Sequence, residues 1–199
     1  MSSKQRILGL LFPSDPALWS NDQIDLQELL TDHAYCEMKA AVSCISIIQA
    51  NPEKENLVEQ LMPVAAEEWG HFRLVVQELN KRKMSLGKQR KDRYVNRLQE
   101  FRQKGGSMEG RFLDQLLFMA MIEARSCDRF KILSERIKDA HLKKFYRRFM
   151  ESEAGHYTLF LELGNHYCGK ANTQKRWKEW LVYEAGIVQQ LQVDDTRIH

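Results

Sequence analysis

Apolar residues recur three and four positions apart along four long stretches of the chain, which is the spacing of a helix with one buried face. The pattern predicts helices over about residues 22–50, 53–82, 107–138 and 139–163, and shorter ones over about 92–103 and 173–191. We expect Pro52 to end the first helix, Ser107 to cap the third and Gly164 to end the fourth. Pro63 should kink the second helix or mark its true start.

A glutamate lies near the middle of the predicted buried face of each long helix. In the second and fourth helices a histidine follows three residues later, in the matching runs Glu-Trp-Gly-His and Glu-Ala-Gly-His. Glu37 precedes Glu68 by 31 residues and Glu123 precedes Glu153 by 30, so the chain reads as two copies of one half. The six candidate metal ligands are Glu37, Glu68, His71, Glu123, Glu153 and His156.

This pattern indicates a metal centre. Carboxylates buried together repel one another, and burying each without a partner costs several kcal/mol. Because no lysine or arginine lies on these faces, we expect cations from solution to neutralise them. Two divalent ions balance four carboxylates, and helix residues three apart lie on one face. Mixed carboxylate and imidazole ligands suit iron or manganese better than a metal that prefers thiolate.

The same ligand set predicts the fold. One glutamate from each of two helices, with Glu-x-x-His from each of two others, is the set used by ferritin-like di-iron and di-manganese proteins. With only 10 glycines and 4 prolines, the sequence predicts an all-α, ferritin-like four-helix bundle with a long crossover between the helix pairs. We expect one domain over residues 1–199, with an N-terminal extension at 1–21, a basic crossover at 83–106 and a tail at 192–199.

Positive charge is concentrated between the two helix pairs. The chain has a formal net charge of +3, but residues 81–104 contain ten basic and two acidic residues and carry +8. Such a segment is a candidate nucleic-acid surface, and its alternative is an ordinary solvated loop. Basic residues from Arg136 to Arg148 are candidates to extend it. The predicted contacts are Lys81, Arg82, Lys83, Lys88, Arg90, Lys91, Arg93 and Arg97.

The remaining composition limits the location and the kind of metal site. The 4 cysteines form no C-x-x-C pair, which argues against a zinc knuckle or a rubredoxin-type iron site, and we expect buried thiols. No apolar run is long enough to cross a bilayer, and Gly9 and Pro13 interrupt the short apolar stretch near the N-terminus. We therefore expect a cytoplasmic protein with no membrane partner.

Three residues near the predicted ligands have simpler interpretations. His33 lies one turn before Glu37 and either lines the site or is a hydrogen-bonded core histidine, the more common role. Glu67 is expected to point away from the metal into solvent. Asp128 is a candidate to orient a ligand histidine from behind.

The stretches AYCEMKAA, PVAAEEWGHF, FMAMIEARSCDRF and ESEAGHYTLF resemble those of the bacterial tRNA hydroxylase family called MiaE, over about residues 26–191. The most specific parts are the Glu-Ala-Arg-Ser run beginning at Glu123 and the two Glu-x-x-His blocks, and all six ligand positions match. The resemblance implies a monooxygenase that hydroxylates the isopentenyl group of 2-methylthio-N6-isopentenyladenosine, beside the tRNA anticodon. It also implies two iron ions on the six ligands, dioxygen as co-substrate, and electrons from a separate reductase or ferredoxin system.

Other functions stay open from the residues alone. A di-iron oxidase or peroxidase acting on a small molecule would use the same ligands. An iron-storage ferroxidase would too, but it would form a large hollow oligomer, whereas we expect a monomer or small homo-oligomer. A metal-free nucleic-acid-binding bundle would explain the basic segment alone. If the glutamates face solvent and the histidines are ordinary core residues, no metal is bound.

Overall fold

The computed structural model describes residues 8–16 and 25–191, and the regular structure in these ranges is helical. Its helices are α1 (Leu26–Ala50), α2 (Glu55–Lys81), α3 (Arg93–Glu100), α4 (Met108–Arg136), α5 (Ala140–Cys168) and α6 (Lys170–Leu191). The described residues form two compact units, a first unit of residues 25–91 and a second unit of 8–16 and 92–191. A single domain over 1–199 stays a prediction, and the tail at 192–199 lies outside the described residues.

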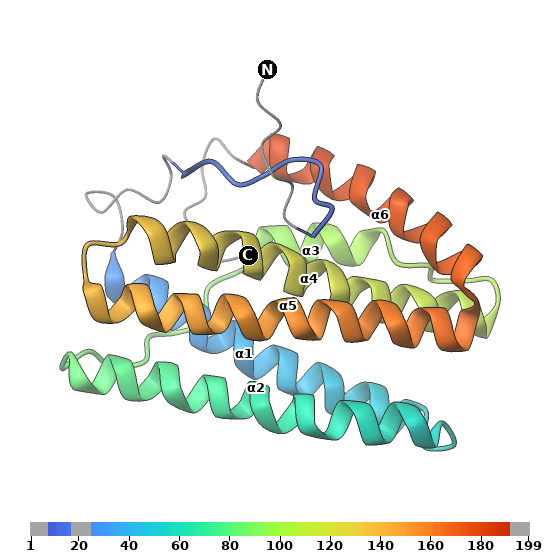
Figure 1. The fold of residues 1–199 in the computed structure, drawn as a ribbon, viewed down its shortest axis with the longest axis horizontal. Helices are drawn as coiled ribbons and strands as arrows, with labels where there is room; N and C mark the ends of the chain where they lie inside the picture. Colours follow the sequence, from blue (N-terminus) through green and yellow to red (C-terminus); the bar gives the residue numbers. More distant parts are fainter. Residues whose placement is uncertain (1–7, 17–24, 192–199) are drawn as a thin grey trace. The chain divides into compact units, whose positions relative to one another are not determined.

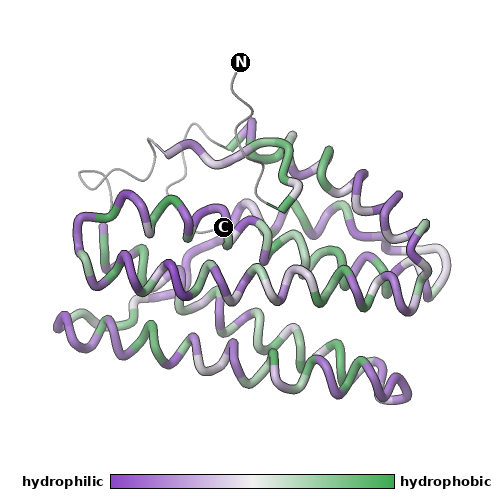
Figure 2. Tube along the Cα trace, viewed as in Figure 1, coloured by the Kyte–Doolittle hydropathy of each residue, from purple (hydrophilic) through white to green (hydrophobic). Residues whose placement is uncertain are grey.

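The first unit is a helical hairpin in which α1 lies along α2 (Figure 1). The first helix begins at Leu26, four residues later than predicted, because the Asp25 side chain caps it and accepts a hydrogen bond from the Glu28 N–H at 3.0 Å. The apolar seam between the helices is fully buried at Leu30, Ile47, Leu57 and Leu61 among others. Along the other helices too, hydrophobic and hydrophilic positions alternate with the helical repeat (Figure 2).

Pro63 lies inside α2, which begins at Glu55, so the proposal that it marks the start of the helix is wrong. A proline in a helix removes the hydrogen bond to the carbonyl four residues earlier. Pro63 and Glu59 are both exposed, so water can satisfy that carbonyl. The helix therefore continues through the proline.

Residues 84–91, here called the strap, run in an extended path along α1 and are fixed to it by side chains. The Gly87 N–H donates to the Thr31 hydroxyl at 3.2 Å, and the Gly87 carbonyl accepts from the Tyr35 hydroxyl at 3.0 Å. The Ser85 carbonyl accepts from Gln27 at 3.2 Å. Side chains of α1 thus replace the backbone partners that an extended segment outside a sheet lacks.

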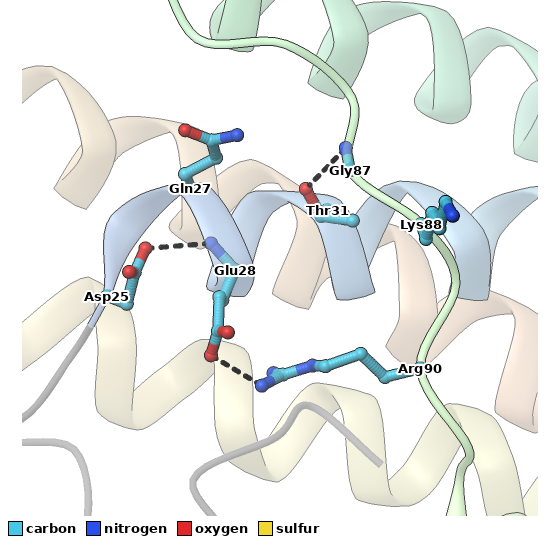
Figure 3. A pocket seen from close by; sticks show the side chains of 7 residues that line it. All are labelled: Asp25, Gln27, Glu28, Thr31, Gly87, Lys88 and Arg90. Atoms are coloured by element: carbon cyan, nitrogen blue, oxygen red, sulfur yellow. Dashed lines mark hydrogen bonds and ion pairs between the residues drawn. The ribbon is translucent and has the colours of Figure 1, made fainter.

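Arg90 anchors the far end of the strap. Its guanidinium donates to both carboxylate oxygens of Asp32 and to Glu28, so it closes one side of a shallow polar pocket of about 390 Å³ (Figure 3). The pocket is lined by Asp25, Gln27, Glu28, Thr31, Gly87, Lys88 and Arg90. Part of the basic crossover is therefore held in a defined path.

The second unit contains a second hairpin, in which α4 lies along α5 and α6 contacts both (Figure 1). Ser107 caps α4 as predicted and accepts from the Gly110 N–H at 3.0 Å. The prediction that Gly164 ends the fourth helix is wrong, because α5 continues to Cys168 and stops at Gly169, whose φ is +80°.

Gly164 is needed for close packing instead. A Cβ atom at this position would lie 3.1 Å from the Thr173 side chain of α6 and 3.3 Å from Leu113 of α4. Both distances are shorter than ordinary van der Waals contact. The glycine lets three helices approach one another, which a search for helix-ending residues does not reveal.

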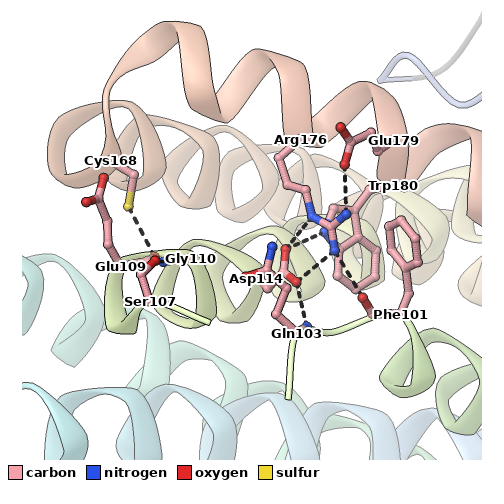
Figure 4. Close-up of polar contacts among 10 residues, drawn as sticks. All are labelled: Phe101, Gln103, Ser107, Glu109, Gly110, Asp114, Cys168, Arg176, Glu179 and Trp180. Carbon is pink, nitrogen blue, oxygen red and sulfur yellow. Dashed lines mark hydrogen bonds and ion pairs between the residues drawn. The ribbon is translucent and has the colours of Figure 1, made fainter. Parts of the chain in front are cut away.

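Asp114 fastens α6 and the segment before α4 to the hairpin (Figure 4). Its carboxylate accepts from the Gln103 N–H at 2.8 Å, from the Arg176 guanidinium at 2.7 and 2.8 Å, and from the indole N–H of Trp180 at 3.1 Å. Arg176 also lies over the ring of Phe101, 4.2 Å from its centroid. The buried charge of Asp114 is thus fully matched by protein donors.

Arg125 of α4 forms a second buried network. Its guanidinium donates to Glu184 of α6 at 2.8 Å, to Asp128 at 2.9 Å and to the Phe12 carbonyl at 2.8 Å. Burial opposes its charge, but the nearby Glu184 and Asp128 raise the pKa of Arg125 above its ordinary value.

Within residues 8–16 and 25–191, no helix is long and apolar enough to cross a membrane.

Replacing Arg125 with alanine should lower the free energy of unfolding by about 3–5 kcal/mol, because the Glu184 and Asp128 carboxylates would stay buried without their cation. Urea unfolding measures this change. The control is Arg148→Ala on the exposed face of α5, which should cost less than about 0.5 kcal/mol. Equal effects of the two substitutions would show that the network contributes nothing.

Candidate metal centre

The first unit brings three predicted ligands together. Glu37 of α1 and Glu68 and His71 of α2 are buried, and each offers one ligand atom within 4.8 Å of the other two. Glu68 and His71 meet because positions three apart on α2 lie on one face, and Glu37 faces them across the hairpin. We call these three residues the first half-site.

The His71 ring is oriented by carboxylates on both sides. Its Nδ1 lies 3.3 Å from Glu37 Oε2 and 3.6 Å from Glu68 Oε2, whereas its Nε2 lies 3.6 Å from Glu67 Oε1. Glu67 is half-exposed as predicted, and it lies beside the ring nitrogen that faces away from Glu37 and Glu68. Nδ1 is therefore the nitrogen directed at the half-site, and Nε2 is directed outward.

His33 adjoins the first half-site and is also a hydrogen-bonded core histidine, so both interpretations of it hold. Its Nε2 donates to Glu37 Oε1 at 2.7 Å, and the residue is fully buried. Burial, followed by the neighbouring His71, holds the pKa of His33 well below its ordinary value, so the ring is neutral. His33 thus holds one oxygen of Glu37, and the other oxygen, Oε2, lies on the His71 side, 3.3 Å from Nδ1.

The second unit assembles the corresponding residues. Glu123 of α4 and Glu153 and His156 of α5 are buried, and their ligand atoms lie within 4.8 Å of one another. His156 Nδ1 lies 3.6 Å from Glu153 Oε2, the same distance as between His71 and Glu68 in the first unit. We call these three residues the second half-site. The repeat seen in the sequence is thus a repeat of geometry.

Two other residues beside the second half-site do not join it. Cys127 Sγ donates to the Met150 carbonyl at 3.4 Å, and burial, followed by the charges of Glu153 and Asp128, raises the pKa of Cys127 to about 12. The thiol is therefore protonated and a poor ligand. Asp128 accepts from Arg125 and from the Ser14 N–H at 2.9 Å, so the prediction that it orients a ligand histidine is wrong.

The carboxylate and imidazole atoms of the half-sites are suited to bind a metal ion, whereas the buried arginines of α4 point elsewhere. Arg125 and Arg129, the buried arginines of α4, are directed at Glu184 and at the ring of Tyr94, away from Glu123. Carboxylate oxygens and imidazole nitrogens converging within a few ångströms are the ligands that iron and manganese accept. Each half-site is thus suited to hold a divalent ion.

The predicted nucleic-acid contacts divide into two groups. Arg82 binds Glu78 at 2.8 Å, and Arg97 donates to Gln190 at 2.6 Å. With Arg90, which anchors the strap, and Lys81, whose Nζ lies 3.8 Å from Glu78, four of the eight thus make contacts within their own unit. Lys81 is nevertheless exposed, as are the other four: Lys83, Lys88, Lys91 and Arg93.

Buried Glu-x-x-His pairs on α2 and α5, each joined by a glutamate of the neighbouring helix, define a ferritin-like carboxylate protein. A solved structure, Protein 43 with aldehyde deformylating oxygenase activity from Synechococcus, is similar over 96% of this chain and 94% of its own, with a TM-score of 0.87 and 28% identity. It confirms the predicted all-α, ferritin-like fold class.

The family model described as tRNA-(MS[2]IO[6]A)-hydroxylase (MiaE) matches residues 5–199, and the chain belongs to this family. Two relatives carry the name tRNA 2-(methylsulfanyl)-N(6)-isopentenyladenosine(37) hydroxylase. The protein from Pseudomonas putida is 32% identical and is aligned over 74% of this chain and 71% of its own. The protein from Salmonella typhimurium is 25% identical, over 79% and 76%. The predicted family is confirmed.

Replacing Glu68 with glutamine tests whether Glu68 is a metal ligand or an ordinary buried acid. In metal-free protein, the substitution should leave the unfolding temperature unchanged or raise it, because it removes one of several clustered negative charges. Manganese(II) at 100 times its dissociation constant should stabilise the wild type by about 2.7 kcal/mol and the variant by much less.

Thermal unfolding of chelator-treated protein, with and without manganese(II), measures both effects. The control is Glu67, the half-exposed neighbour of Glu68. The substitution Glu67→Gln should keep most of the metal-dependent stabilisation. If manganese stabilised Glu68→Gln as much as the wild type, Glu68 would not be a ligand.

Proposed function

We propose that this chain is a di-iron, dioxygen-dependent monooxygenase that hydroxylates the isopentenyl group of 2-methylthio-N6-isopentenyladenosine in tRNA. Membership of the MiaE family and two half-sites of matching geometry support this function. The observation that carries it is the equal 3.6 Å spacing of histidine and glutamate in both halves, in a chain whose relatives are named for this reaction.

We infer that the two half-sites combine into one dinuclear centre. Each half-site offers only two carboxylates and one imidazole, fewer ligands than iron or manganese usually takes. Together they offer four carboxylates, which balance the charge of two divalent ions, and two neutral histidines. Glu68 and Glu153 each stand beside a histidine on the same helix face, so each would hold a metal ion together with that histidine.

When bound and reduced, the iron pair would supply the two-electron activation of dioxygen needed to oxidise an allylic C–H bond of the isopentenyl group. The residues of the chain hold the ligands in place and exclude water. His33 fixes one oxygen of Glu37, and buried Met119 and Phe149 lie one turn from Glu123 and Glu153. An apolar surround of this kind suits a prenyl group and keeps water from competing with it.

The reaction requires an electron donor outside this chain. Hydroxylation consumes one dioxygen, two electrons and two protons, and yields one alcohol and one water. We propose that a separate reductase or ferredoxin system supplies the electrons, and that the protein acts in the cytoplasm as a monomer or small homo-oligomer. The absence of a C-x-x-C pair in the sequence supports an external donor over a built-in rubredoxin-type relay.

The exposed lysines around the strap are proposed to dock the anticodon stem-loop. Lysine is a flexible, strongly hydrated point charge, which suits contacts to phosphates of varied geometry. Because side chains of α1 and the Arg90 anchor fix the path of the strap, Lys88 is presented from a backbone that is already ordered. Docking there loses less conformational entropy than docking on an unstructured loop.

Replacing Lys83 and Lys88 together with glutamine should weaken tRNA binding at low salt, because two phosphate contacts are lost. The slope of log affinity against log salt should fall by about 2, roughly one unit for each lysine. The control is the double substitution of Lys170 and Lys175, which are exposed on α6. If the two pairs had equal effects, the docking surface would lie elsewhere.

Replacing Glu153 with glutamine should lower the hydroxylation rate by more than about 100-fold. Losses of about 10- to 100-fold are typical for residues that hydrogen-bond to a metal ligand, and the loss of a ligand itself should be larger. The assay incubates reduced, iron-loaded protein with prenylated tRNA and oxygen, then tests the digested nucleosides for one added oxygen atom. Glu151→Gln, an exposed neighbour on α5, is the control.

If the wild type added no oxygen to the base while its metal site turned over, the proposed function would be wrong. A large hollow oligomer that accumulates iron would instead indicate storage. Dioxygen-dependent turnover that is insensitive to tRNA and to salt would indicate an oxidase or peroxidase acting on a small molecule.

A further inference from the structure

The first unit exposes an aromatic pair beside its half-site. Trp69 is 48% exposed, whereas every other phenylalanine, tyrosine and tryptophan within residues 8–16 and 25–191 is buried or partly buried. Its ring stacks on Phe72, with ring centroids 4.9 Å apart and planes 27° apart. The outer face of an indole held in this way offers a flat apolar surface to a second ring.

Trp69 is next to the candidate ligands in sequence. It follows Glu68 directly and precedes His71 by two residues on α2. One residue along a helix corresponds to a rotation of about 100° and a rise of about 1.5 Å. A base stacked on the indole would therefore lie at nearly the same height along the helix as Glu68, about a quarter turn around the helix from it.

The repeat shows that this surface is special to the first unit. The residues of α5 that correspond to Trp69 and Phe72 are Ala154 and Tyr157. Tyr157 contacts Trp177 of α6, with ring centroids 5.8 Å apart, so a helix of the same unit covers that face of α5. The corresponding face of α2 carries the larger aromatic residue and leaves it half in solvent.

A basic residue accompanies the indole. Arg73 is exposed four residues after Trp69, which places the two side chains on neighbouring positions of the helix surface. The corresponding residue of α5 is Thr158, which is uncharged. An aromatic face beside a guanidinium matches a nucleotide, because the ring stacks on the base and the cation binds the phosphate.

We propose that Trp69, supported by Phe72, is the platform on which the unstacked purine base of the RNA loop stacks, with Arg73 binding a backbone phosphate. This assignment rests on the proposed function and names the protein surface that holds the substrate base. A base stacked at Trp69 would lie one residue along α2 from Glu68, on the side of the helix away from His71, so its N6 substituent would run past Phe72 to reach the half-site. Stacking does not distinguish bases, so selectivity then depends on the prenyl group.

The test measures binding of an RNA anticodon stem-loop carrying 2-methylthio-N6-isopentenyladenosine to the full chain loaded with metal. Trp69→Ala should weaken binding roughly 5- to 100-fold, the range for loss of a base–aromatic stack, and should raise KM more than it lowers kcat. Trp69→Phe keeps an aromatic face and should retain most of the affinity. Arg73→Gln should lower the salt slope by about 1.

Met62→Ala is the matched control, because Met62 is exposed on α2 two turns before Trp69 and should not affect binding. Metal content and the unfolding midpoint verify that each variant is folded. If the wild type bound the RNA and Trp69→Ala bound it equally well, the platform assignment would be wrong and the proposed function would stand.

A wild type that does not bind the modified stem-loop would overturn both proposals together. A wild-type dimer that Trp69→Ala converts to a monomer would assign the aromatic pair to an interface between two copies, and would also overturn the platform. Sedimentation of the wild type and of the variant distinguishes this last outcome from loss of RNA binding.

Discussion

The structure depends above all on how buried negative charge is neutralised. Glutamates on the inner faces of helices are far from water, and no cationic side chain lies on those faces. The buried arginines of α4 are committed elsewhere, since Arg125 binds Glu184 and Asp128. Glu123 and Arg125 therefore lie on different faces of one helix, and the guanidinium of Arg125 neutralises Glu184 and Asp128. This separation lets the second unit contain a rigid ionic network without filling its ligand site.

The two halves of the chain share a ligand geometry but differ around it. His33 donates to Glu37 in the first half-site, whereas the position four residues before Glu123 is Met119, whose side chain has no N–H to donate. The carboxylate of Glu37 is thus restrained by a histidine of its own helix. On the outer side, Ala154 in the second half replaces Trp69 in the first. The two half-sites thus share their ligand types but differ in the side chains around them.

Much of the fold and of the candidate site could be predicted from the sequence, because helical periodicity and Glu-x-x-His spacing are local properties. The six candidate ligands could be chosen from the sequence because each half-site depends on positions three apart and on one in-phase glutamate, and the structure brings the three residues of each half-site together. The errors came from long-range contacts. Gly164 fits between α4 and α6 instead of ending α5, and Asp128 serves Arg125 instead of a histidine. The role of Arg90 in anchoring the strap likewise depends on residues 58 positions away.

The central claim is that the two half-sites form one centre that holds two metal ions. The most direct measurement is the iron content of the anaerobically loaded protein together with its Mössbauer and electron paramagnetic resonance spectra after oxidation. The account predicts two irons per chain whose spins are coupled, so that the diferric protein gives no resonance signal at low temperature. One iron per chain, or two irons with the spectra of isolated high-spin ferric ions, would contradict it.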